Sequence, residues 1–216
     1  MPGAAALGHH ERVLPSDLND EANWARGFYE LALELGPSDD ARLEQALLAV
    51  WREGCVAGCF APEYRPGNPV RRLIGHSSVE PCLPELRRCH ELHGIVRLPG
   101  GADVVCAAAM DRGETTDWLS FCLPIGALAR ADSRLGTYPF GPDGGRGSLR
   151  WRRPIDDWLA SVAIGIFAEV QFRLGLIGCE AAGEVEAEQL AMGPAPSYLG
   201  YLWPAGGGLR YEEAKG

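Results

Sequence analysis

Lysine is nearly absent from this chain of 216 residues: Lys215 is the only one, and arginine supplies every other permanent cation. Acidic residues outnumber basic residues by 29 to 20, which gives a formal net charge of −9. A protein that binds nucleic acid broadly needs clustered cations to displace counterions from the phosphates. The charge balance therefore argues against nucleic acid as a partner and is compatible with a basic protein partner.

Long apolar runs are missing too. No stretch approaches the roughly 18–20 apolar residues that a membrane-spanning helix needs. The N-terminal residues MPGAAALGHHERV lack both the basic and the apolar region of a secretory signal. The hydrophobic content of 46% and charged content of 23% are ordinary for a globular protein. We therefore expect a cytoplasmic protein that does not span a membrane.

Familiar catalytic motifs are also absent. Residues 90–93 read His-Glu-Leu-His rather than HExxH, there is no G-x-S-x-G, and the glycine-rich run 141–147 lacks the Lys-Ser/Thr of a phosphate-binding loop. The seven cysteines are spread along the chain, mostly among apolar neighbours, which favours buried thiols over a disulfide scaffold. The sequence thus predicts no catalytic residue and no cofactor.

Helical spacing predicts two helices in the N-terminal quarter, after a flexible lead-in at residues 1–16. The first helix begins near residue 17 and ends at Gly36-Pro37, and the second begins at Ser38 and ends near Gly54. The apolar stripe of the first helix is Trp24, Phe28, Leu31 and Leu35. Residues 17–54 should form an antiparallel helical hairpin within a single domain, 17–216.

The clearest core element is a long helix at about 154–171, followed by an apolar strand at 172–179. Pro154 suits a first helical turn, where Asp156 and Asp157 complement the helix dipole. The expected buried face of the helix is Ile155, Trp158, Leu159, Val162, Ile166 and Val170. This helix and strand pair predicts a core rather than a site of chemistry.

Other stretches carry strand and turn signals. Strands are expected at 70–76, 92–98, 104–110 and 118–123, with a short helix at 125–131 and a final hairpin formed by 198–203 and 209–213. Residues 55–69 have a loop composition, and a helical turn is possible after Pro84. Because only one long helix falls between strands, we predict an α+β fold: a helical hairpin, then a mainly antiparallel sheet packed against the long helix, ending in a β-hairpin.

The densest group of metal-ligand residue types lies at 82–93. Zinc needs sulfur and imidazole donors that converge tetrahedrally, usually from closely paired residues. The spacing C-x6-C-H-x2-H matches none of the usual zinc motifs, and adjacent ligands diverge in a strand. The candidate ligands are Cys82, Cys89, His90 and His93. Scattered core cysteines beside surface histidines are the alternative.

Basic residues concentrate in one place, just before the long helix. Arg146, Arg150, Arg152 and Arg153 could hold a phosphate or an acidic partner. The alternative is that these arginines pair with some of the many carboxylates or remain solvated.

Acidic and aromatic residues give the stronger functional signal. Glu184, Glu186 and Glu188 alternate with small apolar residues, which would place three carboxylates on one side of an extended segment. Among the six tryptophans, Trp151 and Trp203 lie beside arginines and beside a turn, where exposure is expected. Aromatic anchors with acidic neighbours are typical of surfaces that bind a basic protein.

These observations predict a non-enzymatic protein-binding module. The specific hypothesis is a bacterial immunity or antitoxin-like inhibitor that masks its partner through an acidic and aromatic face. Electrostatic attraction between an acidic inhibitor and a basic partner accelerates capture. The alternative is an enzyme with a dispersed cysteine–histidine or metal-dependent active site.

Overall fold

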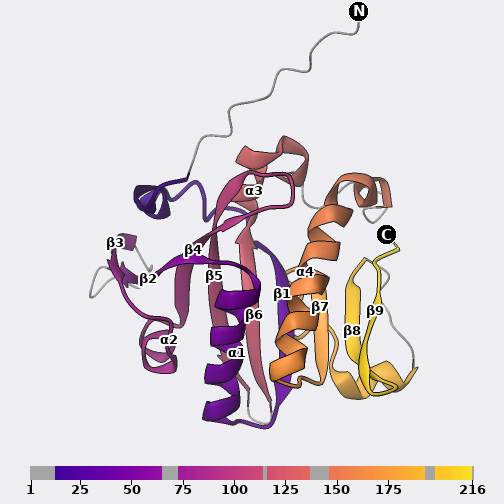
Figure 1. Ribbon diagram of the computed structural model, residues 1–216. Coiled ribbons are helices and arrows are strands. Elements are labelled where there is room, and N and C mark those ends of the chain that lie inside the picture. Colours follow the sequence, from indigo (N-terminus) through magenta and orange to yellow (C-terminus); the bar gives the residue numbers. More distant parts are fainter. Residues whose placement is uncertain (1–12, 65–72, 114–115, 137–145, 193–197, 216) are drawn as a thin grey trace, which may run out of the picture.

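A single antiparallel sheet organises the chain (Figure 1), and the computed structural model describes residues 13–64, 73–113, 116–136, 146–192 and 198–215. The described residues form nine strands in the order β3-β2-β4-β5-β6-β1-β7-β8-β9. The strands are β1 (Phe28–Gly36), β2 (Ala57–Tyr64), β3 (Leu73–Ser78), β4 (Glu91–Arg97), β5 (Asp103–Arg112), β6 (Asp117–Pro124), β7 (Leu174–Cys179), β8 (Gly200–Ala205) and β9 (Gly208–Glu212). The α-helices are α1 (Asp40–Glu53), α2 (Leu83–Cys89), α3 (Ile125–Ala131) and α4 (Leu149–Glu169). Short 3₁₀ segments are η1 (Pro15–Asn19), η2 (Ser133–Gly136), η3 (Arg146–Ser148) and η4 (Ala187–Met192). The predicted α+β fold with an antiparallel sheet is confirmed.

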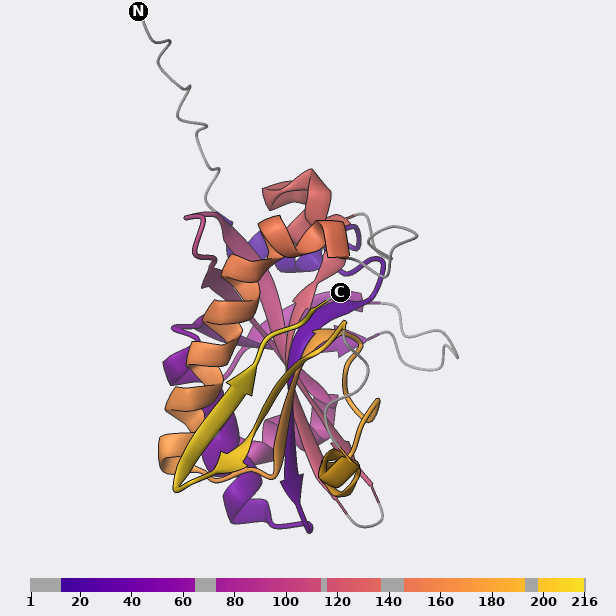
Figure 2. The same ribbon diagram turned by 90° about the vertical axis from the view of Figure 1, so that its right-hand side faces the viewer.

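Helices α1 and α4 pack against each other and cover one face of the sheet, which we call the helix face (Figure 1). Helix α1 begins after Asp39, whose carboxylate accepts hydrogen bonds from the backbone N–H groups of Ala41 and Arg42. It buries Leu43 and Leu47 completely, and each buried leucine stabilises the fold by about 2 kcal/mol. The other side of the sheet, the opposite face, carries η4 and the chain leading to it (Figure 2).

The predicted N-terminal helix is wrong, because residues 28–36 form strand β1 at the middle of the sheet, between β6 and β7. Only part of the expected helical stripe, Leu31 and Leu35, also fits a two-residue period, together with Leu33 between them. In β1, Leu31, Leu33 and Leu35 point to the helix face, while Glu30 and Glu34 point to the opposite face. The helical hairpin at 17–54 is therefore replaced by a strand followed by α1. The lead-in 1–16 lies largely outside the described residues.

Helix α4 also differs from its prediction, since it starts at Leu149 and places Pro154 inside the helix. The added turn is held by Arg152, whose side chain is 2% exposed and donates to the hydroxyl of Tyr29 over 3.0 Å. One turn later Asp156 lies 3.8 Å from Arg152 and accepts a hydrogen bond from Tyr29. These tertiary contacts explain why the helix extends past the local start signal at Pro154.

The remaining elements follow the sequence with two omissions. The predicted strands at 92–98, 104–110, 118–123 and 172–179, the helix at 125–131 and the final hairpin correspond to β4, β5, β6, β7, α3 and β8–β9. Strand β3 matches the described part of 70–76. The segment expected as a loop at 55–69 contains strand β2. Where the sequence predicted one helical turn after Pro84, the structure has the seven-residue helix α2. Strand β2 carries Gly58 and Pro62, both poor strand residues, so pairing with β3 and β4 overrides its composition.

Two buried glutamates attach the segment after β7 to the opposite face. The Glu30 carboxylate accepts from the N–H of Ala182 over 2.9 Å, and that of Glu34 accepts from the N–H of Ala187 over 2.7 Å. Arg173 forms an ion pair with Glu34 at 3.1 Å. These contacts cover β7 and β8. Farther along the same face, toward β4, β2 and β3, the covering layer is the chain around η1, and a pocket lies there.

Candidate functional site

The four candidate metal ligands are distributed over different parts of the fold. Cys89 is buried in the core with α2, whereas His93 points to the opposite face of β4. Cys82 caps α2, and His90 ends it in a left-handed conformation with its side chain exposed. Across the described residues no group of three or more His, Cys, Asp or Glu side chains is arranged to hold a metal ion. The structure does not bring the four together.

The arginine cluster likewise separates into different roles. Arg152 is buried against Tyr29, and Arg153 pairs with Glu213 and donates to the carbonyl of Ala214. Arg146 and Arg150 are exposed. Residues 141–145 of the glycine-rich run lie outside the described residues. Two of the four arginines thus stabilise the fold rather than line a common anion site.

The predicted acidic segment is exposed but is not a strand. Glu184, Glu186 and Glu188 are exposed around buried Val185; the first two lie in the turns that lead into η4, and Glu188 lies within η4. Glu188 forms an ion pair with Arg173. Trp203 packs near this segment, with Arg210 over its ring at 5.2 Å. Trp151, in the first turn of α4, instead packs against the main core, so the two tryptophans belong to different clusters.

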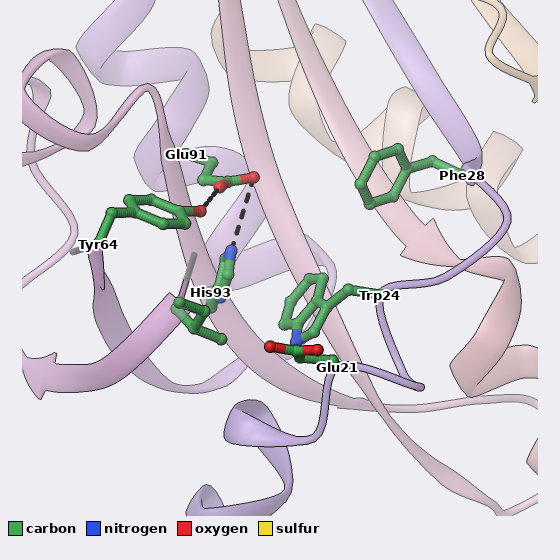
Figure 3. A pocket seen from close by; sticks show the side chains of 7 residues that line it. Glu21, Trp24, Phe28, Tyr64, Glu91 and His93 are labelled. Atoms are coloured by element: carbon green, nitrogen blue, oxygen red, sulfur yellow. Dashed lines mark hydrogen bonds and ion pairs between the residues drawn. The ribbon is translucent and has the colours of Figure 1, made fainter. Parts of the chain in front are cut away.

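Sequence reasoning did not identify a pocket of about 250 Å³ that lies near β2, β3 and β4, far along the sheet from Trp203 on β8. The turn after η1 forms one side, and the ends of β2, β3 and β4 form the other (Figure 3). The described lining residues are Glu21, Trp24, Phe28, Tyr64, Leu73, Glu91 and His93. They comprise three aromatic rings, two carboxylates, one imidazole and one leucine, and neither lysine nor arginine is among them.

Trp24 and His93 form the floor of this pocket. His93 is only 2% exposed, and its ring stacks on the indole of Trp24 with centroids 3.9 Å apart and planes 24° apart. The indole N–H of Trp24 donates to the carbonyl of Leu18 over 2.8 Å, which fixes the ring against η1. The pocket wall is therefore held in place before any ligand arrives.

A second histidine sets the proton positions of the first. Nδ1 of His76 lies 3.0 Å from the amide oxygen of Asn19, and Nε2 of His76 lies 2.7 Å from Nδ1 of His93. Because an amide oxygen only accepts, Nδ1 of His76 carries a proton and Nε2 accepts one from Nδ1 of His93. Burial, together with His93 alongside, lowers the pKa of His76 to about 4, so the His76 ring is neutral near pH 7.

This arrangement leaves Nε2 of His93 as a lone-pair acceptor. It is buried, and it has no hydrogen-bond partner among the described residues. An oxygen of Glu91 lies 3.6 Å away, longer than a hydrogen bond (Figure 3). The other Glu91 oxygen accepts from the hydroxyl of Tyr64. Two acceptors thus stand side by side at the pocket wall.

Four of the seven cysteines are in settings that disfavour nucleophilic chemistry. Burial raises the pKa of Cys59 and Cys179 to about 12, and it raises the pKa of Cys106 and Cys122 as well. These four thiols stay protonated near neutral pH and are poor nucleophiles. No cysteine is among the described residues that line the pocket.

The comparisons with known proteins return no match: neither a protein-family model, nor a curated protein, nor a solved structure resembles the chain. Within the described residues, no helix is long and apolar enough to cross a membrane. Functional inference therefore depends on the geometry of the pocket.

One local signal could have identified part of this site. Glu91 and His93 are two residues apart in β4, so their side chains share one face of the strand. The other buried residues of this strand are apolar or glycine. Polar side chains in a buried part of a strand can mark a functional site, because burying a polar group costs free energy unless that group forms hydrogen bonds. The contributions of Trp24 and Tyr64 carry no such signal, since only the folded chain brings them to β4.

Proposed function

We propose that this chain is a protein-binding module that captures a basic partner, and that its pocket receives a cationic group of that partner. The observation that carries the proposal is the combination of aromatic walls with carboxylates. Aromatic faces carry negative electrostatic potential and attract cations, as does a carboxylate beside them. Trp24, Phe28 and Tyr64 supply the rings, and Glu21 and Glu91 supply the charges.

The charge of the whole protein supports the same proposal. With a net charge of −9, the chain attracts a basic partner over long range and accelerates its capture at low salt. The exposed Glu184 and Glu186 would add to this attraction, outside the pocket. An inhibitor of the immunity or antitoxin type, which masks a basic partner, is the specific role that we propose.

A titration with small cations tests the pocket directly. We would add acetyl-arginine amide, acetyl-lysine amide and choline to the full-length protein and follow the indole N–H of Trp24 by NMR, with acetyl-glutamine amide as the neutral control. The cationic probes should shift this signal in a saturable way and the neutral probe should not. Equal binding of the neutral probe, or no binding of any cation, would contradict the proposal.

Matched charge variants sharpen this test. Glu91→Gln should weaken cation binding by at least about tenfold, because a hydrogen bond to a charged group contributes roughly 1.5–3 kcal/mol. Glu80→Gln removes the same charge from an exposed position outside the described pocket lining and should leave binding unchanged. Equal weakening in both variants would point to net charge alone.

A second candidate is an enzyme that uses the same pocket for acid–base chemistry. The hydrogen-bonded His76–His93 pair beside Glu91 favours it, because such a group can accept a proton from a bound substrate. If the pocket is catalytic, a bound probe would react over hours, and signals of the reaction product would appear in the NMR spectrum. The rate should then fall at least about 100-fold in His93→Gln.

A further inference from the structure

The last strand of the sheet has one edge to which no other described strand is bonded. Strand β9 pairs with β8 on one side, and none of the described strands pairs with its other side (Figure 1). An edge strand presents a row of N–H and C=O groups that another strand can bind. The pocket lies near β2, β3 and β4, at the far end of the strand order, so the edge of β9 is a separate surface.

The turn before β9 sets the hydrogen-bonding pattern of its hairpin with β8. Gly206 and Gly207 form a two-residue turn with φ of 60° and 87°, and the residues that flank it, Ala205 and Gly208, are paired. The residues that flank such a turn form a hydrogen-bonded pair, after which non-hydrogen-bonded and hydrogen-bonded pairs alternate. The next pair contains Pro204, which has no N–H to donate, in agreement with this alternation.

The same alternation decides which groups of β9 face the open edge. Arg210 and Glu212 belong to hydrogen-bonded pairs, so their backbone groups point to β8, whereas the N–H and C=O of Tyr211 point outward. The side chains of Arg210 and Glu212 share one face, because these residues are two apart in the strand. Arg210 is exposed with its guanidinium over the ring of Trp203, and Glu212 pairs with the exposed Lys215.

We propose that β9 forms the interface of a homodimer, in which it pairs antiparallel with β9 of a second copy around a two-fold axis at Tyr211. In this register the outward N–H and C=O groups of the two Tyr211 residues bond each other. Arg210 of each copy then lies directly opposite Glu212 of the other, on the same face of the joined sheet. Opposite charges in directly opposite positions stabilise paired strands, so the charges of β9 complement those of a second copy.

The neighbouring registers lack this complementarity. A two-fold axis at Arg210 would place two arginines opposite each other, and an axis at Glu212 would do the same with two glutamates. Like charges in directly opposite positions are destabilising. An axis between two residues would set an outward-pointing backbone group against an inward-pointing one and break the ladder. The charge pattern therefore favours the register centred on Tyr211.

Two charge reversals, measured by sedimentation velocity from low micromolar to near-millimolar concentration, test this interface. Arg210→Glu places glutamates opposite glutamates, and Glu212→Arg places arginines opposite arginines. Each variant alone should therefore associate at least about tenfold more weakly than the unmodified protein. An equimolar mixture of the two variants restores opposite charges in every pair and should form a heterodimer, which also shows that both variants are folded.

A matched control separates the interface from net charge. Arg88→Glu makes the same change of charge on an exposed side chain of α2, and it should leave self-association unchanged. Equal weakening by Arg88→Glu and Arg210→Glu would overturn the proposed interface.

Amide hydrogen exchange of the unmodified protein supplies an independent test. The N–H of Tyr211 should exchange more slowly as the protein concentration rises, because it becomes hydrogen-bonded in the dimer. The N–H groups of Arg210 and Glu212 point to β8 in either state and should change much less. Equal changes at all three positions would contradict the register.

The remaining outcomes are also decisive. A protein that stays monomeric over the whole concentration range would overturn the proposal, as would a mixture of the two variants that does not associate. Open-ended assemblies larger than a dimer would indicate that β9 pairs with the other edge strand, β3, and would overturn it as well. None of these results bears on cation binding, because the pocket lies away from β9 in each copy.

Discussion

The indole of Trp24 lies nearly flat on the imidazole of His93, with ring centroids 3.9 Å apart. Trp24 belongs to the turn after η1, and His93 belongs to β4, 69 residues later in the numbering of the chain. This contact joins the N-terminal segment to the sheet and shields His93 from water. It thereby forms the floor of the pocket, against which His76 also packs through its hydrogen bond to His93.

Removal of the Trp24 ring should weaken binding strongly at a moderate cost in stability. Because Trp24 is partly exposed, we expect Trp24→Ala to lower the free energy of unfolding by about 2 kcal/mol, below the roughly 3–5 kcal/mol of a fully buried aromatic. Binding of acetyl-arginine amide, measured by calorimetry, should fall more than about tenfold.

Trp203→Ala is the matched control for this change, because Trp203 is also partly buried but lies near η4, away from the pocket. It should lose comparable stability and keep the affinity for the probe. A loss of affinity in Trp203→Ala equal to that in Trp24→Ala would place the cation site elsewhere.

The burial of His76 should make the protein less stable in acid. The folded state lowers the pKa of His76 to about 4, whereas the unfolded chain has the ordinary value of about 6.5. Between these values the unfolded state binds more protons, so the free energy of unfolding falls as the pH drops from 6.5 to 4. In His76→Gln this fall should be smaller by about 1–2 kcal/mol, allowing for the partial exposure of His76.

Urea unfolding at several pH values measures this difference. His90→Asn is a suitable control, since His90 is exposed and Asn tolerates its left-handed backbone with φ of 69°. Its pH dependence should match that of the unmodified protein. Identical pH dependence of His76→Gln and the unmodified protein would show that His76 does not stay neutral in the fold.

Two neighbouring arginines should differ sharply in their effect on stability. Arg152→Ala removes a 2% exposed cation and leaves Asp156 buried without it, which should cost about 3–5 kcal/mol of unfolding free energy. Arg150→Ala changes an exposed side chain and should stay within about 0.5 kcal/mol. Denaturant unfolding of both variants checks the contrast, and equal effects would contradict the structural role of Arg152.

Local sequence signals predicted many elements of the sheet. The hairpin between β4 and β5 turns at Pro99-Gly100-Gly101, and Gly101 has a φ of 86° that glycine adopts without strain. The hairpin of β8 and β9 has the same character at Gly206 and Gly207. These turns and the alternating strands beside them act over a few residues, so they can be read from the chain alone.

The sequence by itself determined the α+β class, the antiparallel hairpins, helix α1 and the core of α4. Only the tertiary structure decided that residues 28–36 are a strand, because part of their apolar spacing fits both a helical and a two-residue period, and pairing with β6 and β7 selects the second. The pocket was likewise decided by the fold. Trp24, Tyr64 and His93 meet through strand order and register, which depend on contacts between residues far apart in the chain.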